Sequence, residues 1–225
     1  MKYLILALSI LSFNAIADNK QIIENNVNEV ITKAKEVSPW LTPQELENIK
    51  KYRFDLETNL LEKRHLSHCK KEASKFCNKQ YDAKCLNQHF TNLNKFCAKA
   101  IENTLKSPTV INGVKFPAGS KIISRDFTTK KITRISSPKI IEFNGIYFDG
   151  SNLLLDNKHG IKSGSLAFPQ KINGIYYGKP HTEFKLHDNG IVANAMLFKP
   201  TIIDGIKLKK DSFLSLYKGV YAEIK

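Results

Sequence analysis

Hydrophobic positions follow two different periods along this 225-residue chain. In the first half, apolar side chains recur every three or four positions, which is the spacing of one face of an α-helix. In the second half they alternate with polar residues in short runs rich in β-branched and aromatic side chains, which indicates strands. Ser107-Pro108 separates the halves, because the residue before a proline disfavours helix. The pattern predicts an α+β protein, with a helical domain over 18–107 and an all-β domain over 108–225.

The extreme N-terminus has the pattern of an export signal. Lys2 supplies a positive charge, residues 3–13 form an apolar run, and Ala15-Ile16-Ala17 is an A-x-A cleavage site. The run has eleven residues, fewer than the about 20 that cross a bilayer, and no later segment is long and apolar enough to do so. Residues 1–17 are therefore expected to be removed, which leaves an exported protein, periplasmic or secreted, that begins at Asp18.

Three helices are expected in the helical domain. The first covers residues 19–36, and the third covers about 82–105. The second begins at Thr42-Pro43-Gln44-Glu45, where threonine caps the helix, proline takes the first helical position and glutamate closes a capping box. Its apolar pattern continues towards Cys77.

Four cysteines predict two disulfide bonds in this domain. An even number in an exported chain favours disulfides, with three possible connectivities for Cys69, Cys77, Cys85 and Cys97. The turn near residues 78–84 makes its flanking helices antiparallel, which favours the nested pairs Cys77–Cys85 and Cys69–Cys97. Eight residues separate the first two cysteines and twelve the last two, about 12 Å against about 18 Å at helical rise. The third helix must therefore tilt, bend or fray if both bridges are to form.

Four copies of a short phrase divide the β domain. The phrase is Asn-Gly, or once Asp-Gly, between apolar residues, and it occurs at 111–114, 143–146, 172–175 and 203–206. Steps of 32, 29 and 31 residues between its glycines indicate an array of about four 30-residue repeats. Each repeat is expected to contain two or three short strands. One repeat is too small to bury its own apolar face, so neighbours must pack into an elongated sheet, a β-solenoid or an open stack of hairpins.

The cysteine segment matches a known pattern. It combines a C-x7-C opening with an aromatic before its second cysteine, a Cys-Leu pair, and His, Leu and Cys four, eight and twelve residues after the third cysteine: Cys69, Phe76, Cys77, Cys85, Leu86, His89, Leu93 and Cys97. Residues 68–101 thereby resemble the cysteine-rich repeat of the Golgi cysteine-rich glycoprotein family, with a shorter central loop and one copy in place of a tandem array. The resemblance implies a disulfide-stapled helical hairpin that binds proteins in the secretory space, without catalytic chemistry. The β repeats are similar to MORN-type β-hairpin repeats, which also couple Asn-Gly turns to alternating strands.

The positive charge is concentrated in the repeats. The formal net charge is +14, and +13 without Lys2. Residues 18–107 contain 16 basic and 12 acidic residues, whereas 108–225 contain 18 basic and 9 acidic ones. Such an excess favours anionic partners such as lipopolysaccharide, acidic glycans or anionic lipid headgroups, and nucleic acid is not the partner expected outside the cytoplasm. Generic solubility, or the high lysine content that an AT-rich genome produces, is the alternative explanation.

Six basic residues in the first repeat form the predicted anion-binding site. They share a stretch of nineteen residues with a single acidic residue, Asp126: Lys121, Arg125, Lys130, Lys131, Arg134 and Lys139. In a strand, turn, strand arrangement, their charges would gather at one edge or tip and could meet phosphate, sulfate or carboxylate groups. The alternative is edge protection, because lysines keep an end strand from pairing with other chains. A second basic cluster, Lys207, Lys209 and Lys210, suits that alternative at the opposite end of the array.

Catalytic motifs are missing from the sequence. It contains no G-x-S-x-G elbow, H-E-x-x-H pair, P-loop or G-x-G-x-x-G fingerprint. Of the nine acidic residues of the repeats, four fall in expected turns, where aspartate is favoured for backbone reasons: Asp149, Asp188, Asp204 and Asp211. A carboxylate pair for sugar hydrolysis is possible but is not marked by any motif. A metal site built from His65, His68, Cys69 and His89 would need a reduced thiolate, which exported proteins usually oxidise. No cofactor and no metal are therefore expected.

Together these patterns predict an exported, non-catalytic binding or scaffold protein. The basic repeat surface is the expected contact for an anionic envelope or extracellular partner. Protein interaction through the cysteine-rich hairpin is one alternative function, and hydrolysis of cell-wall or other glycans is another. The sequence does not predict an oligomeric state.

Overall fold

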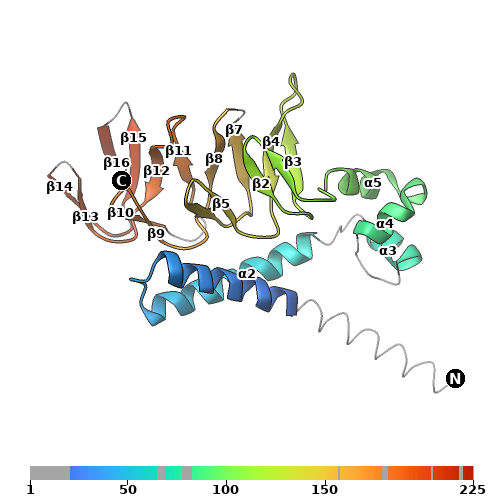
Figure 1. Cartoon of the computed structure of the whole chain (residues 1–225), viewed down its shortest axis with the longest axis horizontal. Helices are drawn as coiled ribbons and strands as arrows, with labels where there is room; N and C mark the ends of the chain where they lie inside the picture. The colour runs from blue at the N-terminus through green and yellow to red at the C-terminus, as the bar shows by residue number, and fades with distance from the viewer. Residues whose placement is uncertain are drawn as a thin grey trace, which may run out of the picture. The chain divides into compact units, whose positions relative to one another are not determined.

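The computed structural model describes residues 21–64, 69–77, 83–156, 158–178, 182–203, 205–217 and 220–224 (Figure 1). The predicted export signal, His65, His68 and Asp204 lie outside the described residues. The chain divides into two compact units, Met1–Lys33 with Thr42–Ile101, and Ala34–Leu41 with Glu102–Lys225. The β unit therefore includes residues 102–107, which the sequence placed with the helices, and a short segment from near the N-terminus.

The first unit begins with two long helices. One covers residues 21–37, the last of which belong to the other unit, and α2 spans Pro43–Arg64. The predicted capping box is present, because the Glu45 N–H donates to Thr42 Oγ1 at 3.3 Å and the Thr42 N–H donates to Glu45 Oε2 at 2.8 Å. None of the described helices combines the length and apolar character that a bilayer crossing requires.

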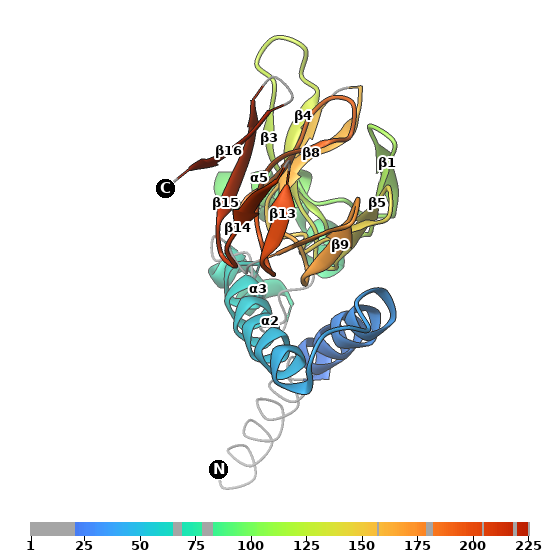
Figure 2. The same cartoon turned by 90° about the vertical axis from the view of Figure 1, so that its left-hand side faces the viewer.

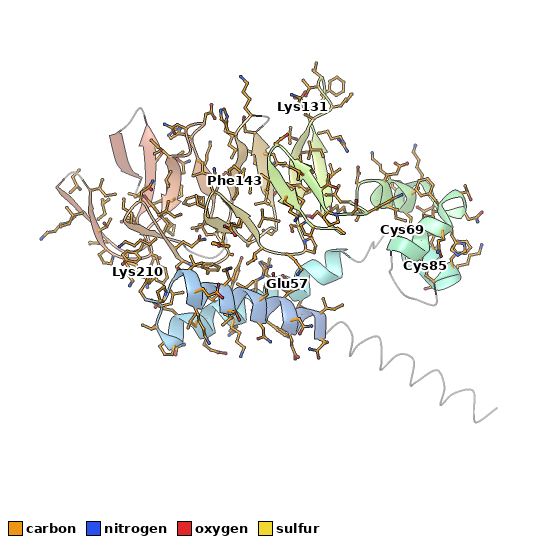
Figure 3. The ribbon with its side chains drawn as sticks, in the orientation of Figure 1. Glu57, Cys69, Cys85, Lys131, Phe143 and Lys210 are labelled. Atoms are coloured by element: carbon orange, nitrogen blue, oxygen red, sulfur yellow. A yellow bond between two sulfur atoms is a disulfide. The ribbon has the colours of Figure 1, made fainter. Side chains whose placement is uncertain are left out.

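An ion pair is buried within α2. Arg53 Nη2 lies 2.6 Å from Glu57 Oε1 one turn later, and the two side chains are 0% and 1% exposed. Asn26 of the first helix donates from Nδ2 to Glu57 Oε2 at 3.2 Å. Figure 3 labels Glu57 on its helix. A carboxylate thus joins the two helices from the inside.

Four short helices are described in the cysteine module, residues 69–102: α3 (Lys70–Phe76), α4 (Ala83–Gln88), η2 (Phe90–Asn92) and α5 (Lys95–Glu102). Its disulfides join Cys69 to Cys97 and Cys77 to Cys85, with Cα atoms 4.8 and 6.0 Å apart. This is the nested pairing that the sequence favoured. Figure 3 labels one cysteine of each bridge.

The expectation of one continuous helix over 82–105 is wrong. Leu93 is extended, and Asn94 caps α5 by accepting the N–H groups of Phe96 and Cys97 at Oδ1, both at 2.9 Å. This break removes the mismatch between the two cysteine spacings, because Cys85 and Cys97 no longer lie along one rigid helix. The helical segment ends at Glu102 because the Leu105 N–H donates to the Ser120 carbonyl in the β unit.

Sixteen strands are described in the β unit: β1 (Thr109–Ile111), β2 (Val114–Phe116), β3 (Lys121–Arg125), β4 (Ile132–Ser136), β5 (Ile141–Phe143), β6 (Ile146–Phe148), β7 (Leu153–Asp156), β8 (Gly160–Gly164), β9 (Gln170–Ile172), β10 (Ile175–Tyr177), β11 (Phe184–Leu186), β12 (Val192–Met196), β13 (Thr201–Ile203), β14 (Ile206–Leu208), β15 (Phe213–Tyr217) and β16 (Val220–Ile224). Each repeat has four strands, not the two or three expected. The expected number is too low because strands such as β8, with glycine at both ends, have weak intrinsic strand preference and are defined by their neighbours.

The two hairpins of each repeat enter different layers. The first hairpins, β1–β2, β5–β6, β9–β10 and β13–β14, stay two-stranded. The second hairpins join into one antiparallel sheet in the order β16-β15-β12-β11-β8-β7-β4-β3. In Figure 2 the hairpins that contain β1, β5 and β9 lie on one side of the sheet that contains β3, β8 and β15. The second hairpins thus form one extended sheet, which is one of the predicted arrangements, and the first hairpins stay outside it.

The core of the β unit lies between these layers. Phe116, Phe148 and Tyr177 come from the two-stranded hairpins and are 0%, 0% and 1% exposed. They share one cluster with sheet residues such as Leu153 and Phe184. The Phe148 and Tyr177 rings meet the Phe184 ring edge-on, with centroids 6.1 and 5.9 Å apart. Each repeat therefore buries its apolar side chains against the neighbouring repeats, as expected for a protein built from small repeated units.

Segment Ala34–Leu41 is held in the β unit by aromatic and polar contacts. Trp40 meets Tyr176 edge-on at a centroid distance of 4.6 Å, and Lys199 Nζ lies 4.3 Å from the Trp40 ring centroid. The buried Ser38 hydroxyl donates to the Pro169 carbonyl at 2.7 Å. The single tryptophan of the chain thus reports on the packing of the β unit.

Candidate functional site

The β3–β4 hairpin lies at one end of the eight-stranded sheet, with β3 as the edge strand. Its connecting loop extends past the loops of neighbouring hairpins (Figure 1). Ile122 pairs with Ile135, and both side chains are buried in the sheet, which fixes the inward face of the hairpin. Two irregularities in register follow along β3, after Ile122 and after Ser124. Irregularities of this kind, β-bulges, bend an edge strand.

Four of the six predicted anion-binding residues lie in the outer part of this hairpin. Arg125 ends β3, Lys130 and Lys131 belong to the loop, and Arg134 lies in β4; all four are exposed. We call this set, with the loop residues 126–131, the basic tip. Figure 3 shows Lys131 there.

Lys121 and Lys139 lie apart from the basic tip. Lys121 is half-buried, pairs with Ser136 and forms a bridge to Thr104 at the base of the hairpin. It is about 13 Å of strand away from Arg125. Lys139 is exposed on the connection to the next repeat. Six charges close in sequence are therefore divided by the strand direction into four at the tip and two at the base.

Asp126 organises the loop. Its Oδ1 accepts hydrogen bonds from the Thr128 N–H at 3.1 Å, the Thr129 N–H at 2.6 Å and the Thr129 hydroxyl at 2.8 Å. These bonds, the one from the Thr129 N–H first, hold the pKa of the Asp126 carboxyl below its usual value. The single carboxylate between residues 121 and 139 is thus ionised and bound by its own loop, so it forms no ion pair with Lys131 or Arg134.

Lys130 closes the loop from the other side. Its backbone has a φ of 59°, its N–H donates to the Asp126 carbonyl at 3.0 Å, and its Nζ donates to the Phe127 carbonyl at 2.7 Å. Arg125 Nη1 donates to the Lys130 carbonyl at 3.3 Å. Within the described part of the chain, no hydrogen bond or ion pair engages the side chains of Lys131 and Arg134. The basic tip therefore combines two residues that shape the loop with two that face solvent.

Edge protection explains some of these charges but not all of them. Arg125 lies in the edge strand, where a charge prevents pairing with another chain. Arg134 lies in β4, which pairs with β3 on one side and β7 on the other, so it protects no edge. Lys131 belongs to the loop, beyond the paired region. The charge at these two positions needs a different explanation.

The second basic cluster differs in setting. Lys207, Lys209 and Lys210 are exposed and lie in or just after β14 of the last two-stranded hairpin. Lys210 Nζ lies 5.1 Å from the Phe198 ring centroid, so part of this cluster packs along aromatic surface; Figure 3 labels Lys210. These lysines provide a matched control for the basic tip.

A cleft of about 550 Å³ opens between the second and third repeats. Asp156, His159 and Asp188 line it, together with the two Asn-Gly turns of these repeats. One ligand-type atom from each of the three residues lies within 4.8 Å of the other two. These residues were not among those singled out in the sequence as a site. The sequence did contain a signal for this cleft. Gly160 and Gly190 occupy the same place in successive repeats, so the turns that contain them become neighbours when the repeats pack.

Local contacts already engage the acidic groups of the cleft. Asp156 Oδ1 accepts the N–H groups of Lys158 and His159 at 2.8 and 3.0 Å and lies 2.9 Å from His159 Nδ1. These bonds, that from Lys158 first, lower the pKa of Asp156. Lys162 Nζ lies 3.7 Å from Asp188 Oδ1. The group offers oxygen and nitrogen atoms suited to a cation or a sugar, but turn geometry and ion pairing account for its arrangement.

The thiolate metal site considered from the sequence is not formed. Cys69 is bonded to Cys97 and therefore has no thiolate to offer. His89 stacks on Phe76, with ring centroids 4.9 Å apart and planes 16° from parallel. The two remaining histidines of that hypothesis, His65 and His68, lie outside the described residues.

No protein-family model, no curated protein and no solved structure matches this chain. The resemblance of residues 68–101 to the Golgi cysteine-rich repeat, and of the β unit to MORN-type repeats, stays a prediction from short motifs. Within the described residues, the basic tip and the cleft offer the chemistry from which a function can be inferred.

Proposed function

We propose that this protein is an exported, non-catalytic binding protein that holds an anionic partner at the basic tip. One observation carries the proposal: four exposed basic residues lie in the outer part of one hairpin, whose single carboxylate is bound by its own loop. Lys131 and Arg134 point their charge at solvent without an ion-pair partner in the described structure. Phosphate, sulfate and carboxylate groups are the ligands that such a set of donors recognises.

The two disulfides support an oxidising location. Together with the N-terminal signal pattern, they favour a protein that works in the periplasm or outside the cell. Polyanions are abundant there as lipopolysaccharide, acidic glycans and anionic headgroups. A basic tip that extends beyond its neighbours can reach such a partner with little change in the rest of the β unit.

Charge reversal at the tip tests this proposal. The Lys131→Glu/Arg134→Glu variant is expected to bind heparin, used as a soluble polyanion, about fivefold to thirtyfold more weakly than the wild type, because each of the two reversed contacts changes the binding free energy by roughly 0.5–1 kcal/mol. The measurement is heparin affinity across a range of salt concentrations. Wild-type binding should weaken as salt rises, because exposed charges are screened.

Lys207→Glu/Lys209→Glu is the matched control. It makes the same change in formal charge with exposed lysines at the other end of the array. If net charge alone were responsible, both double variants would lose affinity equally. That result, or wild-type binding that ignores salt, would contradict a specific site at the basic tip.

The cleft supports a second candidate function, glycan hydrolysis. The observation that favours it is a short distance between two carboxylates: an oxygen of Asp156 and an oxygen of Asp188 lie within 4.8 Å of each other. In retaining glycosidases the two carboxyl groups are roughly 5–5.5 Å apart. The lowered pKa of Asp156 suits a nucleophile or base, so Asp188 or His159 would have to be the acid.

Reducing-end release from cell-wall glycans distinguishes the two functions. A binding protein is expected to release no reducing ends above the blank, whether wild type or Asp156→Asn. Release by the wild type that disappears in both Asp156→Asn and Asp188→Asn would establish the hydrolase instead. Heparin affinity of these two variants serves as the folding control, because neither substitution touches the basic tip.

A further inference from the structure

Phe127 is the most exposed large hydrophobic side chain in the described part of the molecule, at 89%. It lies directly after Asp126 in the basic tip, at the end of the hairpin farthest from the core. Phenylalanine is usually buried, and an isolated exposed one needs no explanation. An aromatic ring at the apex of a loop surrounded by four basic residues is a different case, because both features share one rigid element.

The loop is built to hold this ring out. The Asp126 N–H donates to the Lys131 carbonyl at 2.8 Å, which closes the loop just below the ring. The Phe127 carbonyl is bound by Lys130 Nζ, and the same ammonium lies 4.8 Å from the ring centroid. With the three bonds to Asp126 Oδ1, the backbone on both sides of Phe127 is fixed. Little conformational entropy then remains to be lost when the ring enters an apolar environment.

A soluble polyanion uses only the charges of such a tip. An anionic lipid surface uses both features, since its phosphates attract Lys and Arg while the boundary below them accepts an aromatic ring. The arrangement of Lys130, with its ammonium beside the ring it supports, is the one expected when a ring enters the boundary and the charge remains at headgroup level. The Phe127 ring is 89% exposed, so it gains free energy where water is excluded from it.

We infer that the basic tip docks onto anionic lipid membranes, with Phe127 inserted at the headgroup boundary and Arg125, Lys130, Lys131 and Arg134 bound to lipid phosphates. The inference rests on the proposed function, which supplies the electrostatic part, and adds the lipid surface as the partner. Insertion of one ring and contact by four cations make a reversible attachment, far weaker than a membrane-spanning helix.

Vesicle cosedimentation tests the insertion. The probes are phosphatidylcholine vesicles with and without phosphatidylglycerol, and all proteins carry the same N-terminus so that residues 3–13 contribute equally. Wild type is expected to bind only vesicles that contain phosphatidylglycerol. Phe127→Asn is expected to reduce the partition coefficient about tenfold to a hundredfold, because burial of a phenylalanine ring is lost, whereas Phe127→Leu retains most of it.

A second measurement places the ring directly. Phe127→Trp adds a tryptophan to the single native Trp40, so the difference from wild type reports on the tip. Its emission is expected to shift to shorter wavelength with phosphatidylglycerol vesicles and to be quenched by brominated lipid. An unchanged spectrum for the bound protein would overturn insertion, even if the protein cosediments.

The heparin assay separates the proposed binding of anions at the basic tip from the inferred insertion of Phe127 into lipid. Loss of vesicle binding by Phe127→Asn with unchanged heparin affinity supports lipid insertion. Equal losses on heparin and vesicles would assign the ring to a polymer contact and overturn it. Salt-dependent heparin binding without vesicle binding would overturn the lipid partner alone, whereas absence of both would remove the proposed function as well.

Discussion

Glu57→Gln is expected to lower the free energy of unfolding of the helical unit by about 3–5 kcal/mol, because it leaves the Arg53 charge without its buried counter-charge. Arg53 and Glu57 are 0% and 1% exposed, so water cannot replace the lost partner. The variant also weakens the acceptor that Asn26 uses to join the first helix to α2. Urea denaturation followed by the helical circular dichroism signal measures the effect.

Two comparisons separate burial from charge. Glu47 forms an ion pair with Lys50 on the same helix at 3.9 Å, with side chains more than half exposed, so Glu47→Gln is expected to change stability by less than about 0.5 kcal/mol. Arg53→Met/Glu57→Leu removes both buried charges together and should recover most of the loss. A double variant as unstable as Glu57→Gln would show that the ion pair itself stabilises the helical unit, and that the loss in Glu57→Gln does not come only from leaving Arg53 without a counter-charge.

Local signals predicted much of the fold because their causes lie within a few residues. The Thr42–Glu45 capping box formed as expected, since its hydrogen bonds span three positions. The Asn-Gly phrases became tight hairpin turns, with φ near 50° at Asn112, Asn144 and Asn173, because asparagine and glycine tolerate this backbone best. The nested disulfides followed from the antiparallel geometry of a short hairpin.

The errors arose where distant contacts decide the structure. The third helix is broken at Asn94, whose side chain caps α5 and binds Glu72 from another helix. Strand β8 has a glycine-rich sequence that becomes a strand only between β7 and β11. An i, i+4 pair such as Arg53 and Glu57 resembles a solvated helix pair in sequence, and only the packed structure shows that it is buried.

The candidate site was predicted by composition and refined by topology. Counting charges located the basic segment, but the direction of β3 and β4 separated Lys121 and Lys139 from the other four. Phe127 gave no sequence signal, since a phenylalanine beside a turn is ordinary. Its meaning depends on exposure and on the bonds that fix its loop, both of which come from folding.

Gly150→Ala is expected to destabilise the β unit by about 2–5 kcal/mol, from a left-handed backbone and a steric clash together. Gly150 has a φ of +79°, which favours glycine, and an added Cβ would lie 2.4 Å from the Lys139 carbonyl oxygen. That oxygen belongs to the connection from β4 to β5, so the backbone of the first repeat must move. Trp40 fluorescence in urea reports the change, because Trp40 packs on Tyr176 within this unit.

Gly174→Ala is the matched control for this prediction. Gly174 has a φ of +86° in an Asn-Gly turn, and an added Cβ would meet nothing within 4 Å. Its loss should be limited to the backbone contribution of about 1–2 kcal/mol. The additional loss of stability in Gly150→Ala then measures how closely the Lys139 backbone approaches Gly150, because only at this glycine of the two does a neighbouring chain segment occupy the position of the added Cβ. Equal losses at the two glycines would mean that the connection yields, and that contact between repeats at this turn contributes little to the stability of the array.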